Sequence, residues 1–222
     1  GVGPSPAEHP AAAPPRPVTP ARLRLAAWLS LGNAFASIPV VALLGSLAAG
    51  ESLTFRALHA VVLVAALVIY AVTLFTLRDL LHARGIYEAD AIIKGLLLIS
   101  GAESVLELPW LPGVGEVARE GTALALSAVY WLGLAAFARR LRALGDPLHG
   151  LRDRLAGALM VASVGGLALT AATIPLVGVS EPAVADSTSW MLATLVAAFT
   201  TLFGYARGAI ALARVFWREA CA

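Results

Sequence analysis

The chain has 222 residues, of which 59% are hydrophobic and only 14% are charged. Soluble domains carry about 45–50% apolar and about 25% charged residues, and surface-to-volume scaling keeps a soluble chain of this size from burying so much apolar surface. The composition therefore excludes an ordinary soluble domain and predicts a membrane protein. The net charge is +2, which leaves no excess of positive charge for binding nucleic acid. One cysteine, Cys221, forms neither an internal disulfide nor a thiol-based metal site.

Residues 1–20 precede the first apolar run and contain seven prolines without any apolar periodicity. Such a composition is typical of a disordered or polyproline-like segment. We therefore expect a disordered Pro/Ala-rich tail at 1–20, followed by a single transmembrane domain at 21–219.

Six apolar stretches follow the tail, each near the ~20 residues that a helix needs to cross the hydrocarbon core. We expect transmembrane helices at 25–47, 57–77, 90–108, 121–138, 155–177 and 188–213. The third stretch is the least apolar because it contains Lys94 and Glu103. Its end fits a membrane interface, where Trp110 would lie among the headgroups. The sequence predicts an all-α bundle of six transmembrane helices.

The positive charges test this number of helices, because short cytoplasmic loops carry more Lys and Arg than external ones. If the first helix enters from the cytoplasm, 12 arginines fall in inner segments and only Arg56 and Arg119 fall in outer loops. Without the third helix, the arginines of 138–154 would lie outside. We therefore expect both termini in the cytoplasm and the protein in a bacterial inner membrane.

A signal peptide is the competing interpretation of the first apolar run. Arg22 and Arg24 precede that run, and Ala34-Phe35-Ala36 resembles a small-x-small cleavage site. Cleavage there would leave five helices and an external N-terminus. The apolar run continues well past residue 36, which favours a retained helix.

Motifs of known enzyme sites are missing. The sequence has no phosphate-binding glycine loop, no His-Glu-x-x-His and no Gly-x-Ser-x-Gly. His59 and His82 flank one predicted helix about 34 Å apart, which is too far to share a haem. We therefore expect no catalytic residues, no cofactor and no metal site.

Ionisable residues within the spans are the best functional candidates, because a charge is costly in the bilayer and usually faces a partner or a cavity. Glu103 lies about one turn inside the outer surface, and Glu107 follows it at a like-charge spacing. Lys94 can pair with Asp90 along one helix face or reach the inner interface. Arg207 can also reach the inner headgroups. Each has a structural interpretation beside the functional one.

Two further kinds of residue stand out within the spans. Asn33, in the first span, is typical of a hydrogen bond between helices and is also a candidate ligand contact. Tyr70, Tyr130 and Tyr205 fall in the inner halves of three spans, and we interpret them as an aromatic belt at the interface.

Small residues recur within the last two spans. Gly165 and Gly166 lie in the middle of one predicted helix, and Gly204 and Gly208 share a face of the next. Such spacing is typical of helices that pack closely.

Two classes of function remain open. In the first, the bundle is a membrane-complex subunit or assembly protein that contacts the lipid bilayer, other membrane subunits or a second copy. Its basic inner segment would then contact a partner or anionic lipid through Arg139, Arg140, Arg142, Arg152 and Arg154. In the second, it is a small-solute or ion permease or channel that uses Glu103, Lys94, Arg207 and Asn33. The first is favoured because no span is broken at mid-membrane by paired Gly/Pro elements.

Overall fold

The structure is a computed structural model that describes residues 18–34, 53–106, 115–144, 151–176 and 188–222. These residues form six α-helices: α1 (Pro20–Gly32), α3 (Leu53–Ala83), α4 (Asp90–Leu106), α5 (Glu116–Ala143), α6 (Ala156–Thr173) and α7 (Thr188–Cys221). A π-helical turn, η2 (Leu151–Leu155), precedes α6, and a 3₁₀ turn, η3 (Ile174–Leu176), follows it. Four helical stretches are long and apolar enough to cross a membrane: Ala57–Ala83, Ala118–Ala143, Asp153–Thr173 and Thr188–Cys221. The prediction of an all-α, membrane-type bundle is confirmed to this extent.

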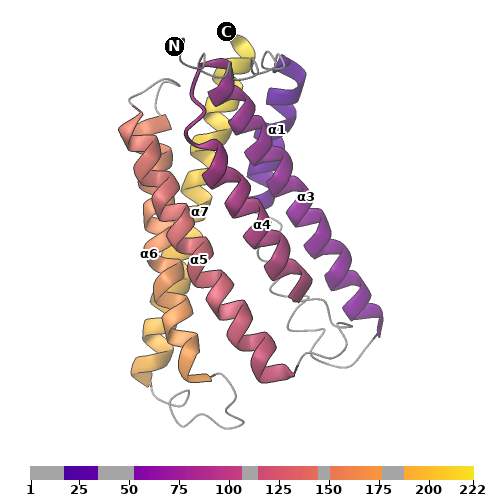
Figure 1. Ribbon diagram of the computed structural model, residues 1–222, viewed down its shortest axis with the longest axis vertical. Helices are drawn as coiled ribbons and strands as arrows, with labels where there is room; N and C mark the ends of the chain where they lie inside the picture. The colour runs from indigo at the N-terminus through magenta and orange to yellow at the C-terminus, as the bar shows by residue number, and fades with distance from the viewer. Residues whose placement is uncertain (1–17, 35–52, 107–114, 145–150, 177–187) are drawn as a thin grey trace, which may run out of the picture.

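The six helices form a closed ring in chain order (Figure 1). Each helix packs on the next, from α1 through α3, α4, α5 and α6 to α7, and α7 packs on α1. The contact between α6 and α7 is the most extensive, whereas α3 packs more sparsely on both of its neighbours. Neighbouring helices run in opposite directions, so α1 begins at the same end of the bundle at which α7 finishes. An up-and-down ring of this kind encloses a central axis that side chains from all six helices can reach.

Four of the described helices, α1, α3, α5 and α7, extend beyond the apolar stretches that predicted them, whereas α4 and α6 lie within theirs. At one end of the ring α3 continues to Ala83, α5 to Ala143 and α7 to Cys221, past the predicted ends at 77, 138 and 213. At the same end α1 begins at Pro20, because Thr19 caps it and accepts a hydrogen bond from the Arg22 amide at 3.4 Å. The added turns carry charged residues, so an apolar pattern taken from the sequence alone does not include them. Parts of the predicted tail and of the first, third and fifth spans lie outside the described residues, at 1–17, 35–47, 107–108 and 177.

The ring is apolar both inside and outside. Its core consists mainly of large side chains in the half nearest the start of α1, including Leu23, Leu77, Leu81, Ile93, Leu96, Phe137, Leu141, Leu155 and Phe216. Large apolar side chains also cover the outer faces, among them Val61, Val64 and Val68 of α3 and Leu192, Leu195, Phe199 and Phe203 of α7. A bundle whose solvent is lipid shows this double apolarity, since lipid tails replace water around the outer side chains.

Glycines hold α6 and α7 together, as the small-residue pattern predicted. A Cβ added to Gly204 would lie 2.3 Å from the backbone nitrogen of Ala162. One added to Gly165 would lie 2.6 Å from the backbone nitrogen of Thr201. The two backbones therefore touch directly, and no side-chain movement could make room for a larger residue.

We expect Gly204→Ala to destabilise the bundle by about 1–3 kcal/mol, because the new methyl group would push the two backbones apart. Gly101→Ala on α4 is the matched control, since a Cβ at Gly101 would meet nothing within 4 Å. Thermal unfolding in detergent should show a lower midpoint for Gly204→Ala alone. Equal midpoints for the two variants would contradict the close contact.

Candidate functional site

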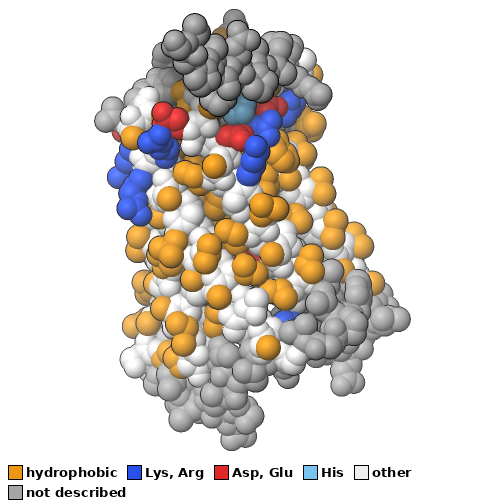
Figure 2. Space-filling model, viewed as in Figure 1, with side chains coloured by type: hydrophobic (Ala, Val, Ile, Leu, Met, Phe, Trp, Pro, Cys, Tyr) orange, Lys and Arg blue, Asp and Glu red, His pale blue; other side chains and the backbone are white. Residues whose placement is uncertain are grey.

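Ion pairs gather at the end of the ring where α1 begins and α7 finishes, which we call the charged end (Figure 2). Asp79 of α3 accepts from Arg22 of α1 at 2.8 Å and from its neighbour Arg78 at 3.2 Å. Asp90, the first residue of α4, pairs with Lys94 at 2.6 Å. The other carboxylate oxygen of Asp90 lies 3.4 Å from Arg78 Nε and 3.4 Å from His82 Nε2. These contacts join α1, α3 and α4 in a line of alternating charge.

A tight turn brings Asp90 to this position. Gly85 has a φ of 75°, a left-handed conformation that suits glycine, and it ends α3. The Ile86 amide donates to the Leu81 carbonyl, and the Gly85 amide donates to the His82 carbonyl, both at 2.9 Å. This pair of bonds is a Schellman motif, which reverses the chain at a helix end. Because of the reversal, α4 begins beside the last turns of α3.

Two further ion pairs connect the charged end across the ring. Arg84 of α3 donates to Glu219 of α7 at 2.6 Å, and Arg140 of α5 pairs with Glu88 between α3 and α4. Single exposed pairs contribute about 0–1 kcal/mol. Together these pairs fix which helix ends lie side by side, so the charged end defines the register of the ring.

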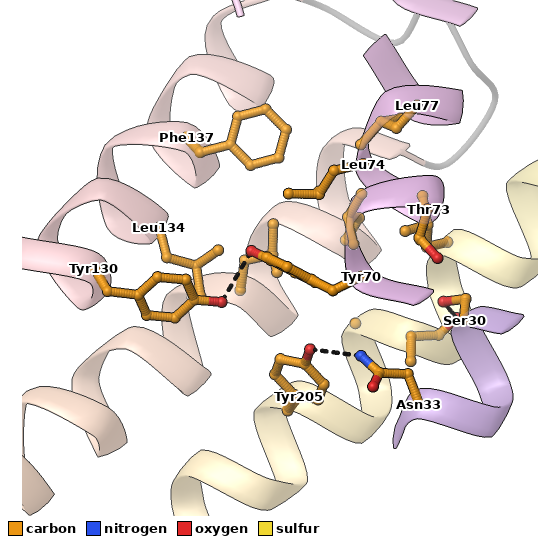
Figure 3. A pocket seen from close by; sticks show the side chains of 15 residues that line it. Ser30, Asn33, Tyr70, Thr73, Leu74, Leu77, Tyr130, Leu134, Phe137 and Tyr205 are labelled. Atoms are coloured by element: carbon orange, nitrogen blue, oxygen red, sulfur yellow. Dashed lines mark hydrogen bonds between the residues drawn. The ribbon is translucent and has the colours of Figure 1, made fainter. Parts of the chain in front are cut away.

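A pocket lies inside the ring, beneath the apolar core (Figure 3). It has a volume of about 60 Å³, enough for a few water molecules or one small group. Polar side chains from four helices line its deeper part: Ser30, Asn33, Tyr70, Thr73, Tyr130 and Tyr205. Leu74, Leu77, Leu134 and Phe137 line the part nearer the charged end, and Leu155, Leu159 and Leu212 add to the apolar lining. The pocket is therefore polar at one end and apolar at the other.

Two hydrogen bonds cross this pocket. The hydroxyls of Tyr70 on α3 and Tyr130 on α5 lie 3.0 Å apart and form one hydrogen bond, in which either of them can be the donor (Figure 3). The Asn33 amide on α1 donates to the hydroxyl of Tyr205 on α7 at 3.1 Å. The Ser30 hydroxyl beside them donates to the carbonyl of Ala209 at 3.3 Å. Neutral groups thus join α3 to α5 and α1 to α7 in the middle of the ring.

The interpretation of the tyrosines as an interfacial belt is wrong. Tyr130 is only 8% exposed, and Tyr70 and Tyr205 also turn inward to line the pocket. A belt would place the phenols among the lipid headgroups, where water completes their hydrogen bonds. Here the hydroxyls have found partners on other helices inside the ring.

The four intramembrane candidates are not brought together. Asn33 lines the pocket, whereas Glu103 on α4 is not among the described lining residues. Lys94 is half exposed and paired with Asp90, as its spacing predicted. The Arg207 guanidinium is exposed and lies 5.4 Å from the ring centre of Phe203.

The basic candidates of the inner segment lie at the charged end on α5 and η2. Arg139, Arg142 and Arg154 are exposed, and Arg140 is engaged with Glu88. The side chain of Arg152 lies outside the described residues. The exposed arginines form a positive surface of the kind that faces anionic headgroups or an acidic partner.

The described lining of the pocket contains hydroxyls, one amide and hydrocarbon, with no carboxylate, histidine, lysine or thiol. These groups can bind a neutral molecule but supply no nucleophile–base pair. No protein-family model matches the chain, and no curated protein and no solved structure is similar to it.

We expect Asp90→Asn to lower stability by about 1–2 kcal/mol, because Lys94, Arg78 and His82 would lose the carboxylate that separates them. Glu88→Gln is the matched control, since it removes one exposed partner of one arginine and should cost less than about 0.5 kcal/mol. Thermal unfolding in detergent measures both. High salt should narrow the difference in unfolding midpoint between the two variants, because it screens the ion pairs. An Asp90→Asn protein as stable as the Glu88→Gln control would show that the network does not organise the charged end.

Proposed function

We propose that the protein is a non-catalytic helix bundle of a bacterial inner membrane that works as a subunit or assembly protein of a membrane complex. The observation that carries the proposal is the apolar layer between the pocket and the charged end. Leu77, Leu81, Phe137, Leu141 and Phe216 fill this layer, and none is more than 1% exposed. A solid layer of this kind suits a bundle that holds a shape for partners better than one that conducts ions.

We further infer six transmembrane helices with both termini in the cytoplasm. Supporting this, α1 begins and α7 finishes at the same end of the ring, and arginines concentrate there. They are Arg22, Arg24, Arg78, Arg84, Arg139, Arg140, Arg142, Arg154, Arg214 and Arg218. The start of α5, at the opposite end, carries Arg119. This asymmetry favours placing the charged end inside the cell.

The outer face of α7 is the surface that best suits a partner helix. Leu192, Leu195, Val196, Phe199 and Phe203 recur at helical spacing, and each is 53–64% exposed. Aromatic and branched side chains in such a stripe pack equally well against lipid or against another transmembrane helix. We propose that this stripe contacts another membrane subunit or a second copy of the chain.

A small-solute or ion permease is the alternative. One feature favours it, namely Glu103, a carboxylate on α4 within the predicted third span, where an ionisable residue is costly. Against it, neither Lys94 nor Arg207 lines the pocket, so the described residues form no charged pathway with Glu103. A flux experiment separates the two functions.

We expect a reporter fused after Cys221 to be active only when it is of the type that works in the cytoplasm. The basic segments at the charged end should hold the C-terminus inside. Matched fusions after Ala83 and after Ala143 should give the same result, since both positions lie at the charged end. An external signal after Cys221 would mean an odd number of spans.

We expect the protein, extracted in a mild detergent from native membranes, to run well above its own mass of 22.9 kDa plus detergent. Leu195→Ala/Phe199→Ala on α7 should shift it to the monomer position, because the stripe would lose two large side chains from its middle. Val64→Ala/Val68→Ala, an outward-facing pair on α3, is the matched control.

Vesicles containing the purified protein should show no proton or cation flux above empty vesicles. A flux that Glu103→Gln abolishes would instead establish the permease.

A further inference from the structure

The tyrosine pair leaves one proton donor unused. Each phenol has a single O–H, so in the Tyr70–Tyr130 hydrogen bond one hydroxyl donates and the other accepts. The accepting hydroxyl still carries its own proton. Among the described residues, nothing else accepts from either hydroxyl, so one O–H is available to an occupant of the pocket.

The second hydrogen bond of the pocket leaves another donor unused. With the Asn33 amide oriented as the structure has it, Tyr205 accepts from the amide nitrogen, so the Tyr205 O–H also lacks an acceptor among the residues that the structure describes. Asn33 and Tyr130 are each only 8% exposed, and both face the cavity (Figure 3). An unsatisfied buried donor costs about 1–3 kcal/mol, so buried hydroxyls almost always have a partner.

The rest of the lining defines the occupant further. No charged side chain lines the described pocket, which favours a neutral molecule, and the two free donors favour a group that accepts hydrogen bonds, such as a carbonyl. The leucines and Phe137 at the other end favour an apolar body. The volume of about 60 Å³ limits the enclosed part to a few heavy atoms.

We propose that the pocket binds the carbonyl group of a small neutral molecule that is soluble in the membrane, or of a lipid ester. The free O–H of the Tyr70–Tyr130 pair and the O–H of Tyr205 donate to the carbonyl oxygen, and the leucine-rich end covers the adjoining hydrocarbon. This site goes beyond the role as a subunit and does not depend on it. It also assigns a purpose to Tyr70, Tyr130 and Tyr205 that the lipid interface does not supply.

Cyclopentanone and cyclopentane test the proposal, because they differ in the carbonyl group alone. The purified protein in nanodiscs should bind cyclopentanone saturably and about tenfold more tightly than cyclopentane, as one or two buried hydrogen bonds imply. The infrared C=O band of ¹³C-labelled cyclopentanone should shift to lower frequency when bound. Equal affinity for the two probes, or no saturable binding, would mean that the pocket holds water only and would overturn the proposal.

Hydroxyl deletions sharpen this test. Tyr70→Phe alone or Tyr130→Phe alone should keep the preference for the ketone, because the remaining phenol of the pair then has a free O–H. The double variant should lose several-fold of the preference, and adding Tyr205→Phe should abolish it. Tyr87→Phe, an exposed phenol outside the pocket, is the matched control. A ketone preference that survives the triple variant would contradict the assignment.

Two additional measurements complete the experiment. If the multiple variants fail to fold, the infrared C=O shift in Tyr205→Phe compared with wild type tests the assignment instead. An unchanged shift would exclude Tyr205 as a donor and overturn the two-donor site.

Nanodiscs of ester-linked and ether-linked lipid distinguish the sources of the carbonyl. Weaker cyclopentanone binding in ester lipid would identify a lipid ester as the natural occupant, and equal binding would identify a free small molecule.

Discussion

The direct backbone contact of α7 with α6 at Gly204 is the constraint on which the rest of the ring depends. In lipid, apolar side chains gain little by leaving the solvent, so helices associate through close packing and hydrogen bonds. A Cβ at Gly204 would overlap the backbone of Ala162, and this approach fixes the rotation of α7. That rotation turns the next residue, Tyr205, toward Asn33, and it directs the apolar stripe of α7 outward.

Polar groups are distributed along the ring according to what the solvent can tolerate at each depth. Full charges occur in pairs at the charged end, where the side chains of Asp79 and Asp90 keep partial contact with the exterior. Deeper in the ring the crossing contacts use phenols, an amide and a serine hydroxyl, because a neutral group loses far less hydration energy than an ion. The leucine and phenylalanine layer separates the two zones, so the ion pairs fix the helix ends while the tyrosines fix the middle.

The sequence predicted the helices and the Lys94–Asp90 pair because these depend on local spacing. It also singled out Asn33, since an amide is conspicuous in an apolar span. It failed for Tyr70, Tyr130 and Tyr205. Tyr130 shares a helical face with Leu134, Phe137 and Leu141, which are all buried, but an outward face of α5 is just as apolar. In a soluble protein polar residues would mark the outer face, whereas in lipid the hydrophobic periodicity cannot tell inside from outside. A phenol is compatible with the interior of the ring and with its outer surface, so only the packing of neighbouring helices decides which way it points.

The same hydrogen bonds hold the ring together and shape the pocket, so an occupant of the pocket would be coupled to the placement of the helices. Tyr70 and Tyr130 connect α3 with α5 across the ring, although these two helices are not neighbours in it. An occupant that accepts a hydrogen bond from the free O–H of that pair would extend the hydrogen-bond chain and fix the separation of α3 and α5 more firmly. Since α3 packs sparsely on α1 and α4, its position has the most to gain from such a constraint. A ligand at the centre would therefore act first on the placement of α3, and through Arg84 and Glu219 on the end of α7 as well.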